Sequence, residues 1–362
     1  MTLLQKLLFS ITFYCLFLSC NVIDPPVTDE EAKAFAKEIE TSFAKKNPSV
    51  FNDLIDPSTF RERVKDAGKG KVENSVLNEI TKGLEKRKLG NEILQLLGEE
   101  GTYELVKHYK EDNEQHLLFR MYGSSGLNYH DMELVRRGDK LKVADLYVYI
   151  TGENMSKTLA DVSIGMQSYY KDNMRTADAN NKEILELRKM ITTKRFEEAK
   201  EKFDGLPNEL KKQKNFQLMN IMILSEVDHD AYKEAINTFA KRFPNEPNLY
   251  LVMIDHHFLQ EDYKAALNDV DQLDALINKD PFLDLYRGNI YNAMDDSEMA
   301  IKHFERLEKN MPAFGDGIIE LAALYLKTDQ QAKAKDLMAK HKQHLPEAKL
   351  NIISILYPDF KM

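Results

Sequence analysis

A pattern of small and large apolar positions recurs through the C-terminal half of this chain and predicts paired helices. In five places an alanine stands four positions, about one helical turn, before a larger apolar residue: Ala199–Phe203, Ala235–Phe239, Ala266–Val270, Ala300–Phe304 and Ala334–Met338. The successive alanines are 36, 31, 34 and 34 residues apart. A small residue lets two antiparallel helices approach closely, and the larger residue fills the space beside it. The spacing therefore predicts an array of helical hairpins over roughly 182–346.

Two of these units carry further positions that are typical of a known repeat. The unit around Ala300 has, in order, Gly288, Tyr291, Ala300, Phe304 and Pro312. The unit around Ala334 has Leu321, Ala322, Tyr325, Ala334, Met338 and Pro346. This order of residues, at a period near 34, resembles the tetratricopeptide (TPR) repeat. The resemblance implies an all-α superhelix with a C-terminal cap over 182–362, whose concave face binds a protein or peptide partner.

The resemblance also implies which side chains line that concave face. In this family the lining comes from first-helix positions 18, 15, 11 and 8 before the signature alanine. From the positions at these offsets before Ala235, Ala266 and Ala300 we take six as partner-binding candidates: Asn220, Asp255, Phe258, Leu285, Asn289 and Asn292. Amides can pair with the backbone of a peptide, whereas Phe258 and Leu285 are either anchors for the partner or core between repeats. Leu251 and Leu285 stand where chaperone-tail binders of the family have lysines, so a carboxylate clamp is absent.

The first residues of the chain have the pattern of a secretory signal. Met1–Lys6 carries one positive charge, and the apolar stretch Leu7–Leu18 follows it. About 20 apolar residues are needed to span a bilayer, so this stretch is too short for a transmembrane helix. Its length and position predict a signal peptide over residues 1–19.

A cysteine directly follows this stretch. Phe17-Leu18-Ser19-Cys20 resembles the lipobox of bacterial lipoproteins, although that family usually has Leu or Val in place of Phe17. The resemblance implies lipid attachment to Cys20, with residues 20–27 as lipidated cysteine and spacer. Asn21, in place of Asp, implies passage to the outer membrane, facing the periplasm. The alternative is an ordinary secretory signal with an incidental cysteine.

Composition excludes several kinds of chemistry. Of the two cysteines, Cys15 leaves with the signal peptide and Cys20 carries lipid, so no thiol remains for a disulfide, a metal or catalysis. The formal net charge is -9 and acidic and basic residues are interspersed, which disfavours nucleic acid as a partner. His341 and His344 have helical spacing but no third ligand, so we expect no metal and no other cofactor.

Residues 28–153 change from a helical pattern to a strand pattern. Thr28 and Glu31 form a capping box at the start of a predicted helix. After Gly101 the apolar period becomes two, which predicts four strands, near 103–105, 117–122, 129–136 and 141–150. Helices followed by antiparallel strands predict an α+β domain. The element order resembles the nuclear-transport-factor-2-like (NTF2-like, cystatin-like) cone fold, and residues 154–181 are predicted as a helical connector.

Polar residues on the predicted strands are candidates for a pocket in this domain. Enzymes with the cone fold line their pocket with polar side chains, and the corresponding candidates here are His108, His116, Tyr129, Asp131 and Tyr147. Surface and packing roles are more frequent for such residues. Gly-x-Ser-x-Gly and His-Glu-x-x-His motifs are absent from the sequence. We therefore predict that the chain is not an enzyme and has no catalytic residue.

The leading hypothesis is a lipid-anchored scaffold of the cell envelope that holds a protein or peptide through its repeats. One alternative is a small-ligand binder or enzyme that works through the N-terminal pocket. Another is an outer-membrane assembly component like the five-repeat lipoprotein of barrel assembly, although the additional N-terminal domain argues against direct equivalence. The sequence leaves the oligomeric state open.

Overall fold

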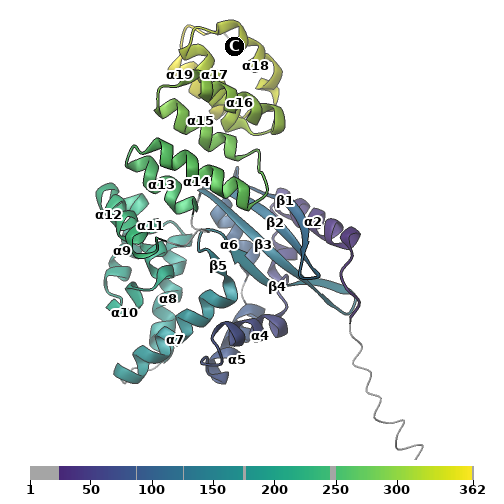
Figure 1. Cartoon of the computed structure of the whole chain (residues 1–362), viewed down its shortest axis with the longest axis vertical. Coiled ribbons are helices and arrows are strands. Elements are labelled where there is room, and N and C mark those ends of the chain that lie inside the picture. Colours follow the sequence, from purple (N-terminus) through teal and green to yellow (C-terminus); the bar gives the residue numbers. More distant parts are fainter. Residues whose placement is uncertain (1–23, 87, 125, 174–176, 245–249, 361–362) are drawn as a thin grey trace, which may run out of the picture.

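The computed structural model of the chain describes residues 24–86, 88–124, 126–173, 177–244 and 250–360. The predicted signal peptide and Cys20 lie outside these residues. None of the helices within these ranges combines the length and the apolar character that crossing a membrane requires. Figure 1 shows an N-terminal part built around a sheet and a C-terminal part built from packed helices.

The N-terminal part confirms the predicted α+β class. Its five antiparallel strands lie side by side in chain order: β1 (Thr102–Glu111), β2 (Glu114–Gly123), β3 (Gly126–Arg137), β4 (Lys140–Val148) and β5 (Glu153–Asn154). The sequence predicts the first four strands but not the short β5. The accompanying helices are α2 (Asp29–Ala44), α3 (Ser49–Asn52), α4 (Pro57–Ala67), α5 (Asn74–Lys86), α6 (Leu89–Leu97) and α7 (Met155–Asn173). The likeness to the cone fold stays a prediction.

The α2 helix begins as the sequence predicts. The Thr28 hydroxyl accepts a hydrogen bond from the backbone N–H of Glu31 at 3.3 Å, and the Glu31 carboxylate accepts from the backbone N–H of Thr28 at 2.9 Å. This reciprocal pair satisfies donors that a helix start otherwise leaves without partners. Ala36, Ile39 and Phe43, spaced at helical intervals, are buried against the sheet.

The two faces of the sheet pack against different partners. Successive side chains of a strand point to opposite faces. Leu117, Phe119 and Met121 of β2 share one core with residues of α2, α3 and α6. Leu118 of β2 and Tyr129 of β3 instead belong to the core of the helical repeats. The repeats are therefore packed directly onto the sheet.

The C-terminal part is a succession of helices: α8 (Ala177–Thr192), α9 (Phe196–Asp204), α10 (Asn208–Lys211), α11 (Lys214–Val227), α12 (His229–Arg242), α13 (Tyr250–Leu259), α14 (Tyr263–Leu276), α15 (Leu283–Ala293), α16 (Ser297–Asn310), α17 (Gly315–Lys327), α18 (Gln331–His341) and α19 (Glu347–Leu356). They pack mainly in pairs, α8 with α9, α11 with α12, α13 with α14, α15 with α16 and α17 with α18. Figure 1 shows these pairs following one another from α9 to α19. This arrangement agrees with the predicted helical repeats.

The signature positions lie where the paired helices touch. Ala199, Ala266, Ala300 and Ala334 are completely buried. Ala235, in one of the less regular units, is only partly buried. On α15, a Cβ atom at Gly288 would lie 2.5 Å from a ring carbon of Phe304, so only glycine fits beside that ring. The packing of small against large residues therefore follows the sequence pattern closely.

Enlarging a signature alanine tests this packing. We expect Ala334→Leu to destabilise the chain by about 1–3 kcal/mol, because overpacking forces neighbouring side chains out of their preferred rotamers. Ala339→Leu is the matched control on the same helix, since Ala339 is exposed, and it should change stability by no more than about 0.5 kcal/mol. Chemical denaturation measures both. Equal midpoints for the two variants would contradict the assignment of Ala334 to a helix contact.

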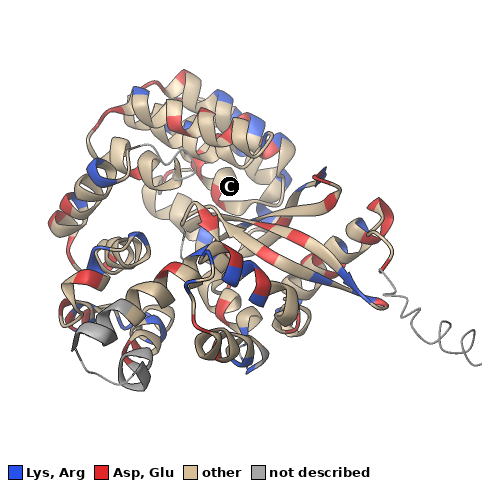
Figure 2. Cartoon of the chain, turned by 60° about the horizontal axis from the view of Figure 1, so that its bottom comes forward, with Lys and Arg blue, Asp and Glu red and all other residues tan. Residues whose placement is uncertain are grey.

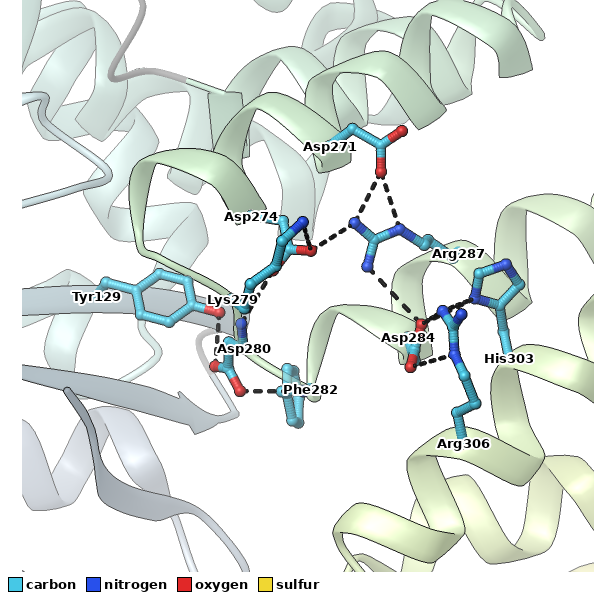
Figure 3. Close-up of polar contacts among 10 residues, drawn as sticks. All are labelled: Tyr129, Asp271, Asp274, Lys279, Asp280, Phe282, Asp284, Arg287, His303 and Arg306. Carbon is cyan, nitrogen blue, oxygen red and sulfur yellow. Dashed lines mark hydrogen bonds and ion pairs between the residues drawn. The ribbon is translucent and has the colours of Figure 1, made fainter.

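A buried ion pair joins the sheet to the repeats. Nη1 of Arg120 on β2 donates to both carboxylate oxygens of Asp280, at 2.6 and 2.9 Å. The hydroxyl of Tyr129 on β3 donates to the same carboxylate at 2.9 Å, and the backbone N–H of Phe282 donates to it at 3.0 Å (Figure 3). Asp280 lies in the loop between α14 and α15, so these bonds fasten that loop to the sheet.

A second ionic network joins α14, α15 and α16 beside this loop (Figure 3). Arg287 on α15 donates to Asp274 on α14 at 2.8 Å. Asp284 on α15 lies 2.8 Å from Nδ1 of His303 and accepts from Nε of Arg306 at 3.0 Å, both on α16. Burial alone would raise the pKa of Asp284, but His303 and Arg306 hold it below its ordinary value. These charges satisfy one another, so the network stabilises the stacking of the helices.

Candidate functional site

The predicted partner-binding residues lie on the first helices of three neighbouring pairs. These helices are α11, α13 and α15, and the residues are Asn220 on the first, Asp255 and Phe258 on the second, and Leu285, Asn289 and Asn292 on the third. Solvent reaches all of them except Leu285. The first helices therefore present a row of polar side chains with one aromatic ring.

Leu285 differs from the other five candidates. Only 6% of it is exposed, and it belongs to the core of the repeats. This favours the alternative that Leu285 packs between repeats and does not contact a partner. Phe258 is 38% exposed, and its ring meets Tyr263 edge-on with the centroids 5.7 Å apart. Phe258 is therefore the one apolar side chain of the six that a partner can reach.

Asp255 has an unusual environment for an accessible carboxylate. The hydroxyl of Tyr232 on α12 donates to Oδ2 of Asp255 at 3.4 Å. Burial raises the pKa of Asp255 to about 6, and the hydrogen bond from Tyr232 opposes this only in part. Asp255 is nevertheless one of the exposed residues of α13.

The sheet carries a second candidate site, a cavity of about 570 Å³. It lies on the face of the sheet that meets the repeats, beside Leu276 and Ile277 at the end of α14. Three of the residues that the sequence marks as pocket candidates line it, namely His116, Asp131 and Tyr147. The structure thus brings these three together in one hollow.

A hydrogen-bonded group lies within this cavity. Asp131 accepts from the hydroxyl of Tyr109, and Nδ1 of His116 lies 3.0 Å from its other oxygen. The rings of Tyr109 and His116 are stacked, with the centroids 5.0 Å apart. Burial alone would lower the pKa of His116, but Asp131 raises it above its ordinary value. The His116 imidazole thus faces a carboxylate at the sheet surface, and this carboxylate favours its protonated form.

The other two pocket candidates, His108 and Tyr129, do not line this cavity. Nε2 of His108 lies 2.6 Å from Oε1 of Gln115, and Gln115 in turn donates to Asp29 at 2.8 Å, so His108 connects the sheet to α2. Tyr129 is fully buried and bonds to Asp280. Both side chains therefore have packing roles.

Tyr109 and Asp145 line the cavity although the sequence does not mark them. Tyr109 pairs with His116 across β1 and β2, and a shift of register between Leu105 and Lys107 changes which β1 side chains face the cavity. An alternation of apolar and polar residues along a strand predicts neither this pairing nor the shift of register. Asp145 is buried and accepts from the backbone N–H groups of Leu146 and Ser156, which a sequence pattern does not show either.

Within the described ranges, no group of three or more His, Cys, Asp or Glu side chains has the geometry to hold a metal ion. His341, one of the two histidines with helical spacing, lies with Nε2 2.6 Å from the Glu308 carboxylate. This contact gives His341 a structural role between α16 and α18.

Comparison with known proteins gives little similarity. No family model matches the sequence, and no curated protein matches it. The crystal structure of MamA protein has a TM-score of 0.36 and 14% identity, and the match covers 50% of this chain and 97% of that one. A mutant of MamA has a TM-score of 0.34 and 11% identity, covering 46% of this chain and 99% of that one. Similarity at this level carries no argument about fold or function.

Replacing Asp255 tests the raised pKa of its carboxyl group. Because burial raises the pKa of its carboxyl from 3.8 to about 6, ionising Asp255 costs folding free energy once the pH exceeds the lower value. We expect Asp255→Asn to be more stable than the wild type above a pH of about 6 and to lose this advantage below 3.8. Thermal unfolding midpoints across this pH range measure the difference.

The matched control for this prediction is Asp295→Asn, which removes a carboxylate that is 94% exposed. That variant should show no comparable gain in stability. Parallel pH profiles for wild type and Asp255→Asn would show that the carboxylate is well solvated and would contradict the prediction.

Proposed function

We propose that this chain is a lipid-anchored scaffold of the bacterial cell envelope that binds a protein or peptide through the concave face of TPR-type repeats. The observation that carries the proposal is the row of accessible side chains on α11, α13 and α15. Asp255, Phe258 and Asn289 are exposed on it, so a partner segment would meet a carboxylate, a ring and an amide together. The proposal includes no catalytic activity and no cofactor, and it treats the sheet domain as NTF2-like.

The surface charge suits a protein partner better than a nucleic acid. In the view of Figure 2, acidic and basic residues are mixed along the helices and form no continuous basic stripe. The whole chain has a formal net charge of -9. Nucleic acid binding depends on basic residues that neutralise phosphates, so this distribution disfavours it.

The position of the N-terminal segment supports an anchor that leaves the repeats accessible. The Pro25 carbonyl accepts from Nε of Arg136 at 2.9 Å, and the backbone N–H of Gly138 donates to Asp24 at 3.4 Å. The second half of the predicted spacer is therefore fastened to the turn between β3 and β4. Figure 1 shows that this turn points away from the repeats. The described chain thus begins, at residue 24, at the end of the sheet away from the partner-binding helices, which favours an anchor that leaves these helices accessible.

The proposed partner surface is tested by removing two of its amides. We expect Asn289→Ala with Asn292→Ala to abolish capture of envelope partners by affinity purification, because amides there would pair with the partner's backbone. The melting temperature should change little, since accessible amides contribute little to folding.

The control for this test is Asn310→Ala with Asn351→Ala, which removes two exposed amides on α16 and α19. Co-purifying chains are identified by mass spectrometry for both double variants. If the folded Asn289→Ala, Asn292→Ala variant retains the same partners as the control, recognition does not occur on α15.

Lipidation is tested at Cys20. We expect the intact mass of the wild type from membranes to include acyl chains on a protein that begins at Cys20. Cys20→Ala should leave the protein either soluble in the periplasm or uncleaved, and Cys15→Ala is the control that should remain anchored. A wild-type mass without acyl chains would overturn the proposed anchor.

A further inference from the structure

A pocket of about 490 Å³ lies where α7, the helix that follows the sheet, meets the first repeats. Lys157, Asp161 and Gly165, at successive turns of α7, contribute one face of that helix to its lining. The start of α11 contributes a second part, and Arg242 and Phe243 at the end of α12 contribute a third. The volume is typical of small-molecule sites, which occupy roughly 300–1,000 Å³. None of these lining residues belongs to the cavity on the sheet.

The start of α11 gives this pocket the character of an anion site. The lining runs from Lys212 to Asn215, which includes the N-cap residue Gln213 and the first two residues of the helix. The Gln213 side chain forms no capping hydrogen bond with the described first turn. A helix cannot pair its own first N–H groups, and its N-terminus carries a partial positive charge. An anion in the pocket would meet both.

Positive charge predominates in the lining. Nζ of Lys214 lies 3.1 Å from the Glu153 carboxylate, and Lys157 forms an ion pair with Asp161. Both acidic residues of the pocket are thus neutralised by its own lysines. Two further lining cations, both exposed, form no ion pair within the part of the chain that the structure describes. These are Lys212 and Arg242.

A buried amide at the start of α11 points independently to a ligand. Asn215 lines the pocket, and only 7% of it is exposed. Its side-chain oxygen is buried and has no hydrogen-bond partner among the described residues. Buried polar groups rarely lack a partner, because an unpaired one costs folding free energy. The two ends of an amide have nearly the same shape, so Asn215 can present its NH₂ group to an anion without a change in packing.

Gln213 shares this feature with Asn215. Its side-chain oxygen is also buried without a partner in the described chain. A Cβ atom at Gly165 would lie 2.0 Å from Nε2 of Gln213, so the amide rests directly on the α7 backbone. Two amides with unpaired oxygens therefore line the same pocket.

We propose that this pocket binds the phosphate group of a small phosphomonoester. The phosphate would accept hydrogen bonds from the start of α11 and from the Asn215 amide, and its two negative charges would pair with Lys212 and Arg242. Ile164 and Phe243 offer apolar surface to the organic part of the ester. The pocket therefore suits an ester better than inorganic phosphate. The inference does not rest on partner binding by the repeats.

The test uses the full chain in a nonionic detergent and a buffer without phosphate. Calorimetry would measure binding of glucose 6-phosphate, glycerol 3-phosphate and dihexanoyl phosphatidate, with glucuronate and inorganic phosphate as comparators. We expect saturable binding of at least one phosphomonoester in preference to both comparators, weakening as salt is added. Tighter binding of the phosphatidate would identify a lipid headgroup as the source of the phosphate, and tighter binding of either other ester would identify a soluble molecule.

Matched variants show whether binding occurs in this pocket. Lys212→Ala and Arg242→Ala remove exposed side chains and should each weaken binding by about fivefold or more. Asn215→Asp, which replaces the amide by a carboxylate of the same shape, should abolish it. Lys241→Ala removes an exposed cation that is adjacent in sequence and outside the lining, so it should leave binding unchanged.

Three results would overturn the inference. One is that none of the three phosphomonoesters binds. Another is that glucuronate or inorganic phosphate binds as tightly as the best ester. The third is that Lys212→Ala and Arg242→Ala both bind with the affinity of Lys241→Ala.

Discussion

The pairing of Arg120 with Asp280 is the contact on which the arrangement of the molecule depends. Both side chains are almost fully buried, at 6% and 1% exposure, so each would be costly to bury alone. Burial by itself would lower the pKa of Arg120, and the carboxylates of Asp280 and Glu104 raise it instead. The Asp280 carboxylate also accepts hydrogen bonds from the Tyr129 hydroxyl and from the backbone N–H of Phe282. Asp280 is bonded to β2 and β3 at the same time, which fixes how the repeats lie on the sheet.

This contact has consequences for both candidate sites. It fixes the loop after α14, and the end of α14 supplies Leu276 and Ile277 to the cavity on the sheet. The same loop leads into α15, which carries Asn289 and Asn292. The cavity and the proposed partner surface are therefore built on elements that the one ion pair positions. A binding surface that is ordered before the partner arrives loses less entropy on binding.

Local features of the fold could be predicted because each depends on residues close together in sequence. The capping box at Thr28, the strands after Gly101 and the buried position of Ala334 all follow from spacing. The contact between β2 and the loop after α14 could not, since Arg120 and Asp280 are 160 residues apart and neither belongs to a repeating pattern. Tyr129 illustrates the same limit: its strand is predicted correctly, but its partner comes from the repeats.

Calorimetric unfolding tests most directly whether the Arg120–Asp280 pair holds the repeats on the sheet. The chain from residue 24 onward is compared with its Asp280→Ala variant. The account predicts one cooperative transition for the wild type. In the variant, which leaves Arg120 buried without its main partner, it predicts a loss of about 3–5 kcal/mol or a split into two transitions. Asp336→Ala, which removes an exposed carboxylate on α18, should stay within about 0.5 kcal/mol of the wild type. Two separate transitions in the wild type, or an unchanged Asp280→Ala variant, would contradict the account.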